Sequence, residues 1–303
     1  MKYLINKFLQ LLKIIIIFRT GHALGEQLYI SSFVKKIKKN NRLFVMTTCP
    51  ELFYYNPDIY KIININKNNL LKKILIYLMN HLLGSNIIFF YPKKFQNINN
   101  KNYLNFYSSS KHVIEINSER ANIKYNSIEL RNFFYFSAHE EILFKKKFSF
   151  LKNYKLIQSE TKTSFTNNKN WNVKNFQEVI NYFPEKNWVQ IGSDKDNKLS
   201  GVIDLTGKTS IRELAFLIKN SEYIICLEGF FAHLSSCFET KAYVIYSGIV
   251  PLSNLLYKNI IPISKSKNLS CSPCYLIDDC PQKKKYCTEN ILANDVIEII
   301  KNK

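Results

Sequence analysis

Short apolar runs of strand length alternate along the first half of the chain with longer segments in which apolar residues recur at helical spacing. Because parallel strands need long crossovers, usually helical, this alternation predicts a parallel sheet with helices on both faces. Residues 91–112 are rich in Asn, Lys, Ser and Tyr and predict an irregular connection. The predicted strands are 14–18, 43–46, 59–65 and 87–90, and the predicted helices are 28–37 and 69–83.

The second half repeats this alternation. Ser210 and Glu213 form a capping-box pattern, and the apolar residues from Ile211 to Ile218 lie on one helical face. A second such pattern, Ser137 with Glu140, predicts a helix toward residue 150, where we place a domain boundary. We expect Rossmann-like α/β domains over 1–150 and 151–303, facing across a cleft. The later strands are 155–158, 188–191, 223–227 and 242–246, and the later helices are 173–183 and one from residue 293, expected to pack back across the domains.

The composition supports two packed cores, since 46% of the 303 residues are hydrophobic. The net charge of +20 favours an anionic partner, yet only five of the 43 basic residues are Arg. Readers of phosphates and bases favour the bidentate Arg fork, so the Lys excess is more typical of biased codon usage. We therefore expect no nucleic-acid partner. A positive surface would instead suit an acidic acceptor or the headgroup side of a membrane.

Residues 1–13 alternate apolar residues with lysines and predict a short basic amphipathic helix that could rest on a membrane surface. No apolar stretch reaches the length of a spanning helix, and Lys7 and Lys13 interrupt any signal-peptide core. We therefore expect a cytoplasmic protein, peripheral on the inner face of the membrane.

A carboxylate and an imidazole follow the buried run 223–227 in the segment Glu228-Gly229-Phe230-Phe231-Ala232-His233. Ligands of open parallel sheets bind in the crevice at the carboxyl ends of the strands, so this turn predicts a binding site. Glu228 is also a suitable helix N-cap, which is compatible with binding. A histidine beside an apolar segment is often purely structural, so the spacing of His233 from Glu228 carries the functional interpretation.

Several motifs, taken in order, resemble glycosyltransferase family nine, which includes bacterial lipopolysaccharide heptosyltransferases. Where the family has Asp, this chain carries Glu26 and Glu228, and its glycine is at 229 instead of 230. The matching segments are 15–19 with 21–26, Lys169-Asn170-Trp171, Asp204 to Leu214, and Glu228 to His233 with 244–248. The resemblance implies a GT-B arrangement of two Rossmann-like domains, with an acceptor-side domain first and a nucleotide-sugar domain second.

The resemblance also implies roles for individual residues. Glu26 follows a glycine at the mouth of the first crevice and is the candidate catalytic base, although an acid in a first helical turn can simply complement the helix dipole. Asp194 could hold a ribose or be a solvated loop acid. The candidate acceptor-binding residues are Arg19 and His22, and the candidate donor-binding residues are Ser164, Thr166, Lys169, Asp194, Glu228, Gly229 and His233.

Four late cysteines, Cys271, Cys274, Cys280 and Cys287, lie within seventeen residues. Their leading CxxC spacing is compatible with a structural zinc or iron site. Reduced thiols or a redox pair are the alternatives, and Lys283 to Lys285 would stabilise thiolates without metal. The fold that the resemblance implies needs no metal for catalysis.

Together these features predict an inverting glycosyltransferase that moves a heptose-like sugar from a nucleotide-diphosphate donor, ADP-heptose by resemblance, to a lipopolysaccharide or other surface-glycan acceptor. Two alternatives remain at this point. One is a catalytically impaired relative that binds a nucleotide sugar or a glycan, which the Glu-for-Asp changes motivate. The other, less favoured, is a basic nucleic-acid-binding protein.

Overall fold

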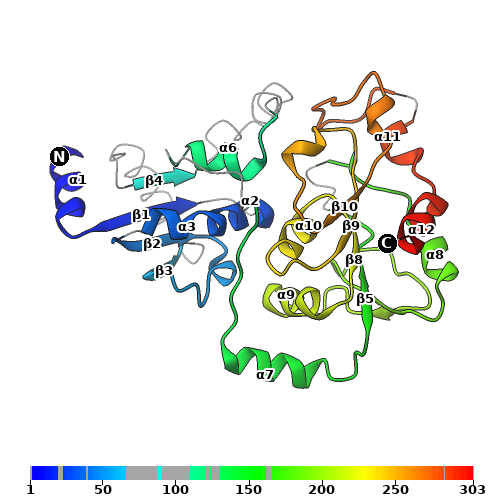
Figure 1. The fold of residues 1–303 in the computed structure, drawn as a ribbon, viewed down its shortest axis with the longest axis horizontal. Helices are drawn as coiled ribbons and strands as arrows, with labels where there is room; N and C mark the ends of the chain where they lie inside the picture. Colours follow the sequence, from blue (N-terminus) through cyan, green and yellow to red (C-terminus); the bar gives the residue numbers. More distant parts are fainter. Residues whose placement is uncertain are drawn as a thin grey trace. The chain divides into compact units, whose positions relative to one another are not determined.

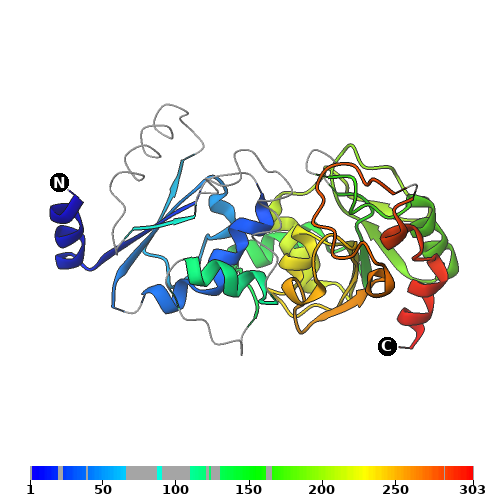
Figure 2. The same ribbon diagram turned by 90° about the horizontal axis from the view of Figure 1, so that it is seen from above.

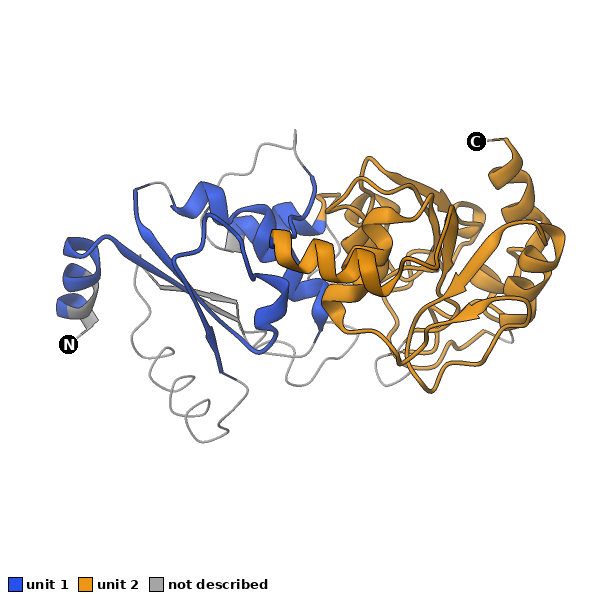
Figure 3. Cartoon of the chain, turned by 90° about the horizontal axis from the view of Figure 1, so that it is seen from below, with its two compact units in different colours: residues 1–96, 113–137 blue, residues 97–112, 138–303 orange. Residues whose placement is uncertain are grey.

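The computed structural model describes residues 2–19, 23–38, 40–65, 87–90, 110–120, 123, 130–161, 166–282 and 284–302. Figures 1 and 2 show its helices and strands in two views. The chain divides into two compact units, drawn in different colours in Figure 3. Unit 1 comprises residues 1–96 and 113–137, and unit 2 comprises residues 97–112 and 138–303.

Unit 1 is built on a parallel sheet whose described strands have the order β3-β2-β1-β4. Its core strand β1 pairs in parallel with both β2 and β4, which confirms the predicted parallel sheet. This order matches one half of a doubly wound fold. The strands are β1 (Ile14–Arg19), β2 (Arg42–Thr47), β3 (Lys61–Asn64) and β4 (Ile87–Phe90).

The predicted continuous helix over 28–37 is wrong, because the chain forms three short pieces there. The hydroxyls of Ser31 and Ser32 donate hydrogen bonds back to the carbonyls of Leu28 and Tyr29, an alternative that serine offers to regular helix. The predicted helix over 69–83 lies outside the described residues. The helices of unit 1 are α1 (Lys2–Leu11), α2 (Leu24–Leu28), η1 (Tyr29–Ser32), α3 (Val34–Lys38), η2 (Pro50–Leu52) and α6 (Val113–Arg120).

Unit 2 contains a larger parallel sheet with the strand order β10-β9-β8-β5-β6-β7. The sequence analysis did not predict β10, whose Pro262 argues against a central strand. Pro262 is tolerated because β10 is an edge strand that pairs with β9 alone. The strands are β5 (Tyr154–Ile157), β6 (Asn187–Gln190), β7 (Ile203–Asp204), β8 (Ile224–Leu227), β9 (Ala242–Ile245) and β10 (Ile260–Ile263).

Helices cover this sheet as the apolar periodicity predicts. The capping box of Ser210 and Glu213 is formed at the start of α9, and the C-terminal helix α12 packs against α8 of the same unit (Figures 1 and 2). Trp171 joins this region by donating its indole N–H to the carbonyl of Ile291 at 2.7 Å. The helices are α7 (Ala138–Lys147), α8 (Val173–Tyr182), α9 (Ile211–Asn220), α10 (Phe230–Ser235), η5 (Leu252–Asn254), η6 (Ser266–Asn268), α11 (Tyr286–Glu289) and α12 (Ala293–Lys301).

Helix α7 groups with unit 2, although the sequence analysis placed it at the end of the first domain. Its Phe144 ring packs on Phe216 of α9 at a centroid distance of 5.7 Å. Its Glu140 accepts hydrogen bonds from Nε and Nη2 of Arg212 on the same helix α9. These apolar and ionic contacts explain why the unit boundary falls before residue 138 and not after residue 150.

Candidate functional site

The carboxyl ends of the parallel strands of unit 2 bring several polar residues to one edge of the sheet. Gln158 follows β5, Glu228 follows β8 and Ser247 lies just beyond β9. Gln158 is 2% exposed and its Oε1 accepts the N–H of Leu227 at 3.1 Å. This bond holds the end of β8 in place directly before Glu228.

Glu228 is a buried carboxylate, and its side chain is only 1% exposed. Its Oε1 accepts a hydrogen bond from the hydroxyl of Ser247 at 2.8 Å and lies 3.5 Å from Nζ of Lys169. Its Oε2 is buried without a hydrogen-bond partner among the described residues. An unsatisfied buried oxygen of this kind is costly, and a ligand hydroxyl would satisfy it.

Lys169 belongs to a turn that precedes α8. In this turn the hydroxyl of Thr166 accepts the N–H of Asn168 at 3.1 Å, and Thr166 is 4% exposed. The side-chain amide of Asn168 donates to the carbonyls of Leu276 and Asp278 at 3.2 and 2.7 Å. The structure thus brings the candidate donor-binding residues Lys169 and Glu228 together, while the Thr166 hydroxyl bonds within the turn. Ser164 lies outside the described residues.

Gly229 forms the turn between Glu228 and α10. Its φ of 152° and ψ of −150° belong to a region that is open essentially to glycine alone. A Cβ at this position would meet nothing within 4 Å, so the backbone angle rather than crowding requires glycine. Helix α10, which follows this turn, has six residues.

His233 lies one turn into α10 and is 6% exposed. Its Nδ1 is 2.9 Å from the hydroxyl of Tyr257, and the ring of Tyr257 also meets His112 edge-on at 4.7 Å. Burial lowers the pKa of His233 to about 3, with further lowering by His112 and Lys169, and burial lowers the pKa of His112 to about 4. Both imidazoles are therefore neutral at pH 7.

Asp194 lies in an exposed loop after β6, two strands away from β8 in the sheet. Its carboxylate accepts a hydrogen bond from the hydroxyl of Ser193 at 3.0 Å. A Cβ on Gly207 would approach Cβ of Asp194 to 2.6 Å, so this loop requires glycine at 207 to pass closely. Asp194 shares the carboxyl edge of the sheet with Glu228. Among the described residues, its hydrogen bond is to Ser193 and not to Glu228, Ser247 or Lys169.

The candidate residues of unit 1 gather after β1. Glu26 is an exposed residue in the first turn of α2. The next residue, Gln27, is fully buried and its amide donates to the hydroxyl of Thr48 at 2.7 Å, while its carbonyl oxygen accepts the hydroxyl of Thr47. These bonds tie α2 to the carboxyl end of β2. Arg19 ends β1, with its side chain outside the described residues, as is all of His22.

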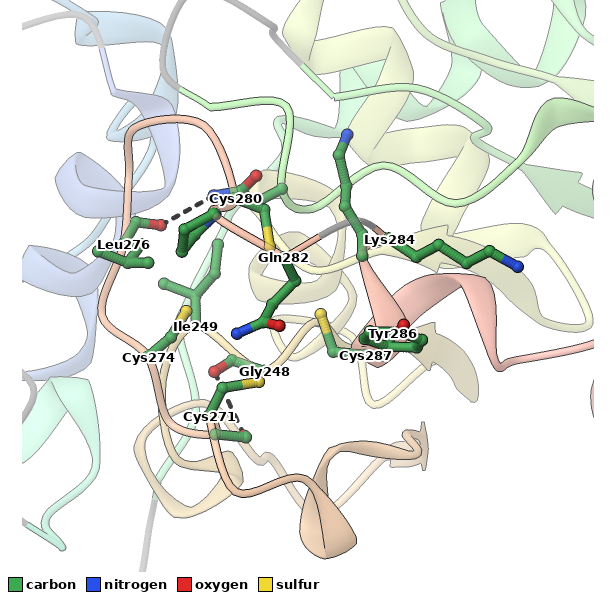
Figure 4. A pocket seen from close by; sticks show the side chains of 14 residues that line it. Gly248, Ile249, Cys271, Cys274, Leu276, Cys280, Gln282, Lys284, Tyr286 and Cys287 are labelled. Atoms are coloured by element: carbon green, nitrogen blue, oxygen red, sulfur yellow. Dashed lines mark hydrogen bonds between the residues drawn. The ribbon is translucent and has the colours of Figure 1, made fainter.

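The four late cysteines line one pocket of unit 2, together with Gly248 (Figure 4). All four are free thiols. Among the residues that the structure describes, no group of three or more His, Cys, Asp or Glu is placed to hold a metal ion. The predicted four-cysteine metal site is therefore not formed in this arrangement. Its members are Cys271, Cys274, Cys280 and Cys287.

The expected thiolate stabilisation does not hold for Cys274 and Cys287, which are half-buried. Burial raises the pKa of Cys274, and the neighbouring cysteines raise it further. Burial likewise raises the pKa of Cys287, with Cys280 and Glu228 adding to the rise. Both side chains are therefore thiols at neutral pH. The effect of Glu228 on Cys287 shows that the pocket is close to the Glu228 carboxylate.

Sequence reasoning missed Ser247 and Tyr257. A signal for Ser247 was present, because it follows the predicted strand 242–246 and so lies on the same edge as Glu228. No comparable signal existed for Tyr257, which reaches His233 from the segment before β10.

Solved structures share this architecture. A family 9 glycosyltransferase from Veillonella parvula has a TM-score of 0.69 at 13% identity, covering 95% of this chain and 96% of that one. The Escherichia coli ADP-heptose LPS heptosyltransferase II has a TM-score of 0.61 at 14% identity, covering 96% and 100%. The iron-containing dodecameric heptosyltransferase TibC of enterotoxigenic Escherichia coli, in complex with ADP-D-β-D-heptose, has a TM-score of 0.63 at 14% identity, covering 95% and 75%.

Two units built on parallel sheets of this kind correspond to the GT-B fold of these glycosyltransferases. The chain belongs to glycosyltransferase family 9 (heptosyltransferase), whose model matches residues 109–285. This confirms the resemblance found in the sequence motifs and the predicted fold class. A comparison with curated proteins gives no match.

Proposed function

We propose that this glycosyltransferase moves a heptose-like sugar from an ADP-linked donor to a lipopolysaccharide or other surface-glycan acceptor. The observation that carries the proposal is the buried Glu228 carboxylate, which lies 3.5 Å from Lys169 and keeps one oxygen without a partner among the described residues. A sugar hydroxyl would supply the missing hydrogen bond, and the Lys169 ammonium would meet the negative charge of a diphosphate. The ADP-heptose in the TibC complex and the ADP-heptose named for heptosyltransferase II support this donor class.

In this mechanism the residues of unit 2 bind the donor and Glu26 of unit 1 takes the proton from the acceptor hydroxyl. Inverting transfer needs such a base, and the exposed carboxylate of Glu26 can serve when the acceptor hydroxyl comes within hydrogen-bond reach. Ser164, Thr166, Asp194 and Gly229 complete the proposed donor site. We assign His233 there as well, as a neutral group fixed by Tyr257. Arg19 and His22 are assigned to the acceptor.

The test of the donor site is binding of ADP-heptose to the purified full chain by calorimetry. Glu228→Gln removes the charge at nearly constant volume, and we expect affinity for ADP-heptose to fall at least about tenfold. Glu178→Gln is a matched control because Glu178 is exposed on α8. Equal affinity of Glu228→Gln and the parent chain would contradict the assignment.

The test of the base is sugar release or transfer from ADP-heptose, followed by mass spectrometry. Glu26→Gln is expected to lower kcat by roughly 100-fold or more with little change in donor affinity. Glu119→Gln, an exposed acid on α6 of the same unit, is the control. A parent chain that binds donor but never turns it over would favour the impaired relative that the Glu-for-Asp changes suggest.

We propose a membrane-surface role for α1. Leu4, Phe8 and Leu11 are 67%, 61% and 76% exposed, whereas Leu9 is buried against its own unit. Lys7 and Lys13 flank this apolar face, which is the pattern of an interfacial helix. The described residues contain no helix long and apolar enough to cross a membrane. Sedimentation with anionic vesicles should capture the parent chain and lose Phe8→Glu, while vesicles of neutral lipid should capture neither.

We also propose that the four-cysteine pocket takes up zinc or iron when its thiols come together. Four thiols on one pocket offer the donor set of a tetrahedral site, and the TibC neighbour is described as iron-containing. Binding would require movement, because no three of them are placed for it in the described arrangement. Protein purified in reducing buffer should hold about one metal per chain by elemental analysis, and Cys271→Ser with Cys274→Ser should hold none.

A further inference from the structure

The two oxygens of the Glu228 carboxylate have different surroundings. Oε1 accepts the hydroxyl of Ser247 at 2.8 Å and faces Nζ of Lys169 at 3.5 Å. Oε2 is buried and has no hydrogen-bond partner in the part of the chain that the structure describes. Within the described residues, Oε1 thus has two polar neighbours, whereas Oε2 can still accept a hydrogen bond from a ligand.

Ser247 is itself held in place. Its hydroxyl oxygen accepts the N–H of Ile249 at 3.4 Å while its single proton goes to Glu228. A serine hydroxyl has only one hydrogen to donate, so this proton is fully used. Ser247 is 1% exposed, which leaves it no solvent partner.

The backbone fixes both residues relative to each other. Strands β8 and β9 pair in parallel with Leu227 opposite Ile245, and the N–H of Glu228 donates to the carbonyl of Ile245 at 3.1 Å. Ser247 and Glu228 are each within two residues of this last ladder pair. The Ser247 hydroxyl therefore meets the carboxylate from a rigid element.

We infer that Ser247 is a positioning residue that sets the sugar specificity of the donor site. The Ser247 hydroxyl and the Lys169 ammonium both lie at Oε1 and leave Oε2 to accept from the ligand. Glu228 therefore recognises one sugar hydroxyl with Oε2 and does not bind two adjacent hydroxyls with its two oxygens. This inference rests on the proposed donor-binding role of Glu228. It gives a specific role to Ser247, which lies in the matching segment 244–248 but has no role assigned by the sequence motifs.

The first test compares ADP-heptose with ADP by calorimetry on the full chain. Ser247→Ala should weaken ADP-heptose about tenfold, because a hydrogen bond to a charged group is lost, and should change ADP less than about twofold. Ser247→Thr keeps the hydroxyl and should bind ADP-heptose within about twofold of the parent. Ser221→Ala removes a hydroxyl that bonds only the carbonyl of Ile218, and it serves as the control.

A second test uses a series of monodeoxy ADP-heptoses in double-mutant cycles with Glu228→Ala. With Ser247 intact, the binding free energies of removing a sugar hydroxyl and of Glu228→Ala should be non-additive for one hydroxyl position alone. Coupling of similar size at two adjacent positions would overturn the single-hydroxyl inference, because it would mean that both oxygens accept from the sugar.

The outcomes separate this inference from the proposed function. If the parent chain binds ADP-heptose more tightly than ADP but Ser247→Ala behaves like the parent, the inference fails and the donor site stands. Equal losses of ADP and ADP-heptose in Ser247→Ala, with Ser247→Thr equally weak, would show a merely structural role. A parent chain that binds neither ligand would overturn both.

Discussion

At the scale of single residues, the site depends on a small number of polar groups that the fold holds out of water. Glu228 and Ser247 are each 1% exposed, and Gln158 ties the end of β8 beside them. A carboxylate held this way needs no reorganisation to meet a ligand hydroxyl, which favours binding. The pKa of Tyr246 is raised first by that residue's own burial and then by the negative charge of Glu228.

Gly229 gives a residue-scale prediction for stability. Gly229→Ala should lower the free energy of unfolding by about 1–3 kcal/mol, because its φ of 152° is strained for any residue with a Cβ. Urea unfolding followed by circular dichroism measures this. Gly201→Ala is the comparison, since Gly201 has a φ of 73° in the more accessible left-handed region. A smaller loss at 229 than at 201 would contradict the argument.

Candidate residues of the site could be predicted where they belong to a local sequence motif. Glu228 and Lys169 could be found because each sits in a motif at a strand end or before a helix. The position of Ser247 after a predicted strand was readable, but its contact with Glu228 depends on β8 and β9 being neighbours in the sheet, which the local pattern does not contain. The four cysteines show the opposite case. Their spacing predicted a metal site, yet the described backbone places them around a pocket without forming one.

At the scale of elements, periodicity predicted most strands and helices of unit 2, because long amphipathic helices alternate there with fully buried strands. It failed where local side chains compete with the helix, at Ser31 and Ser32, and where Pro262 hid an edge strand. Periodicity also could not predict which unit contains α7. That is decided by contacts between residues far apart in the sequence, because Glu140 and Phe144 of α7 contact Arg212 and Phe216 of α9.

Helix α7 carries an element-scale prediction with an internal control. Glu140→Gln should lower the free energy of unfolding by about 3 kcal/mol, because it removes the negative charge that pairs with the guanidinium of Arg212, whose side chain is 9% exposed. Glu141→Gln breaks the ion pair with Lys219, whose side chains are 45% and 41% exposed, and should cost below about 1 kcal/mol. Chemical unfolding of both variants checks the difference, and equal losses would contradict it.

At the scale of the whole molecule, the chain folds into two compact units and carries a net charge of +20, so its positive charges repel one another.

Two histidines make the free energy of unfolding depend on pH. His112 and His233 are buried and neutral, with pKa values lowered to about 4 and about 3. In the unfolded chain each returns to about 6.5 and binds a proton below that pH.

The free energy of unfolding should therefore be constant above pH 7 with respect to these groups and should fall as the pH drops from about 6.5 toward 4. Over that window the unfolded state binds more protons, so each histidine contributes a slope of up to about 1.4 kcal/mol per pH unit. Urea unfolding from pH 4.5 to 8 on His112→Gln and the parent isolates the effect, since carboxylates contribute equally to both. His112→Gln should have the shallower slope, while His139→Gln, which removes an exposed imidazole, should match the parent. Parallel curves for His112→Gln and the parent would mean that the pKa of His112 is the same in the folded and unfolded chain, and would contradict the prediction.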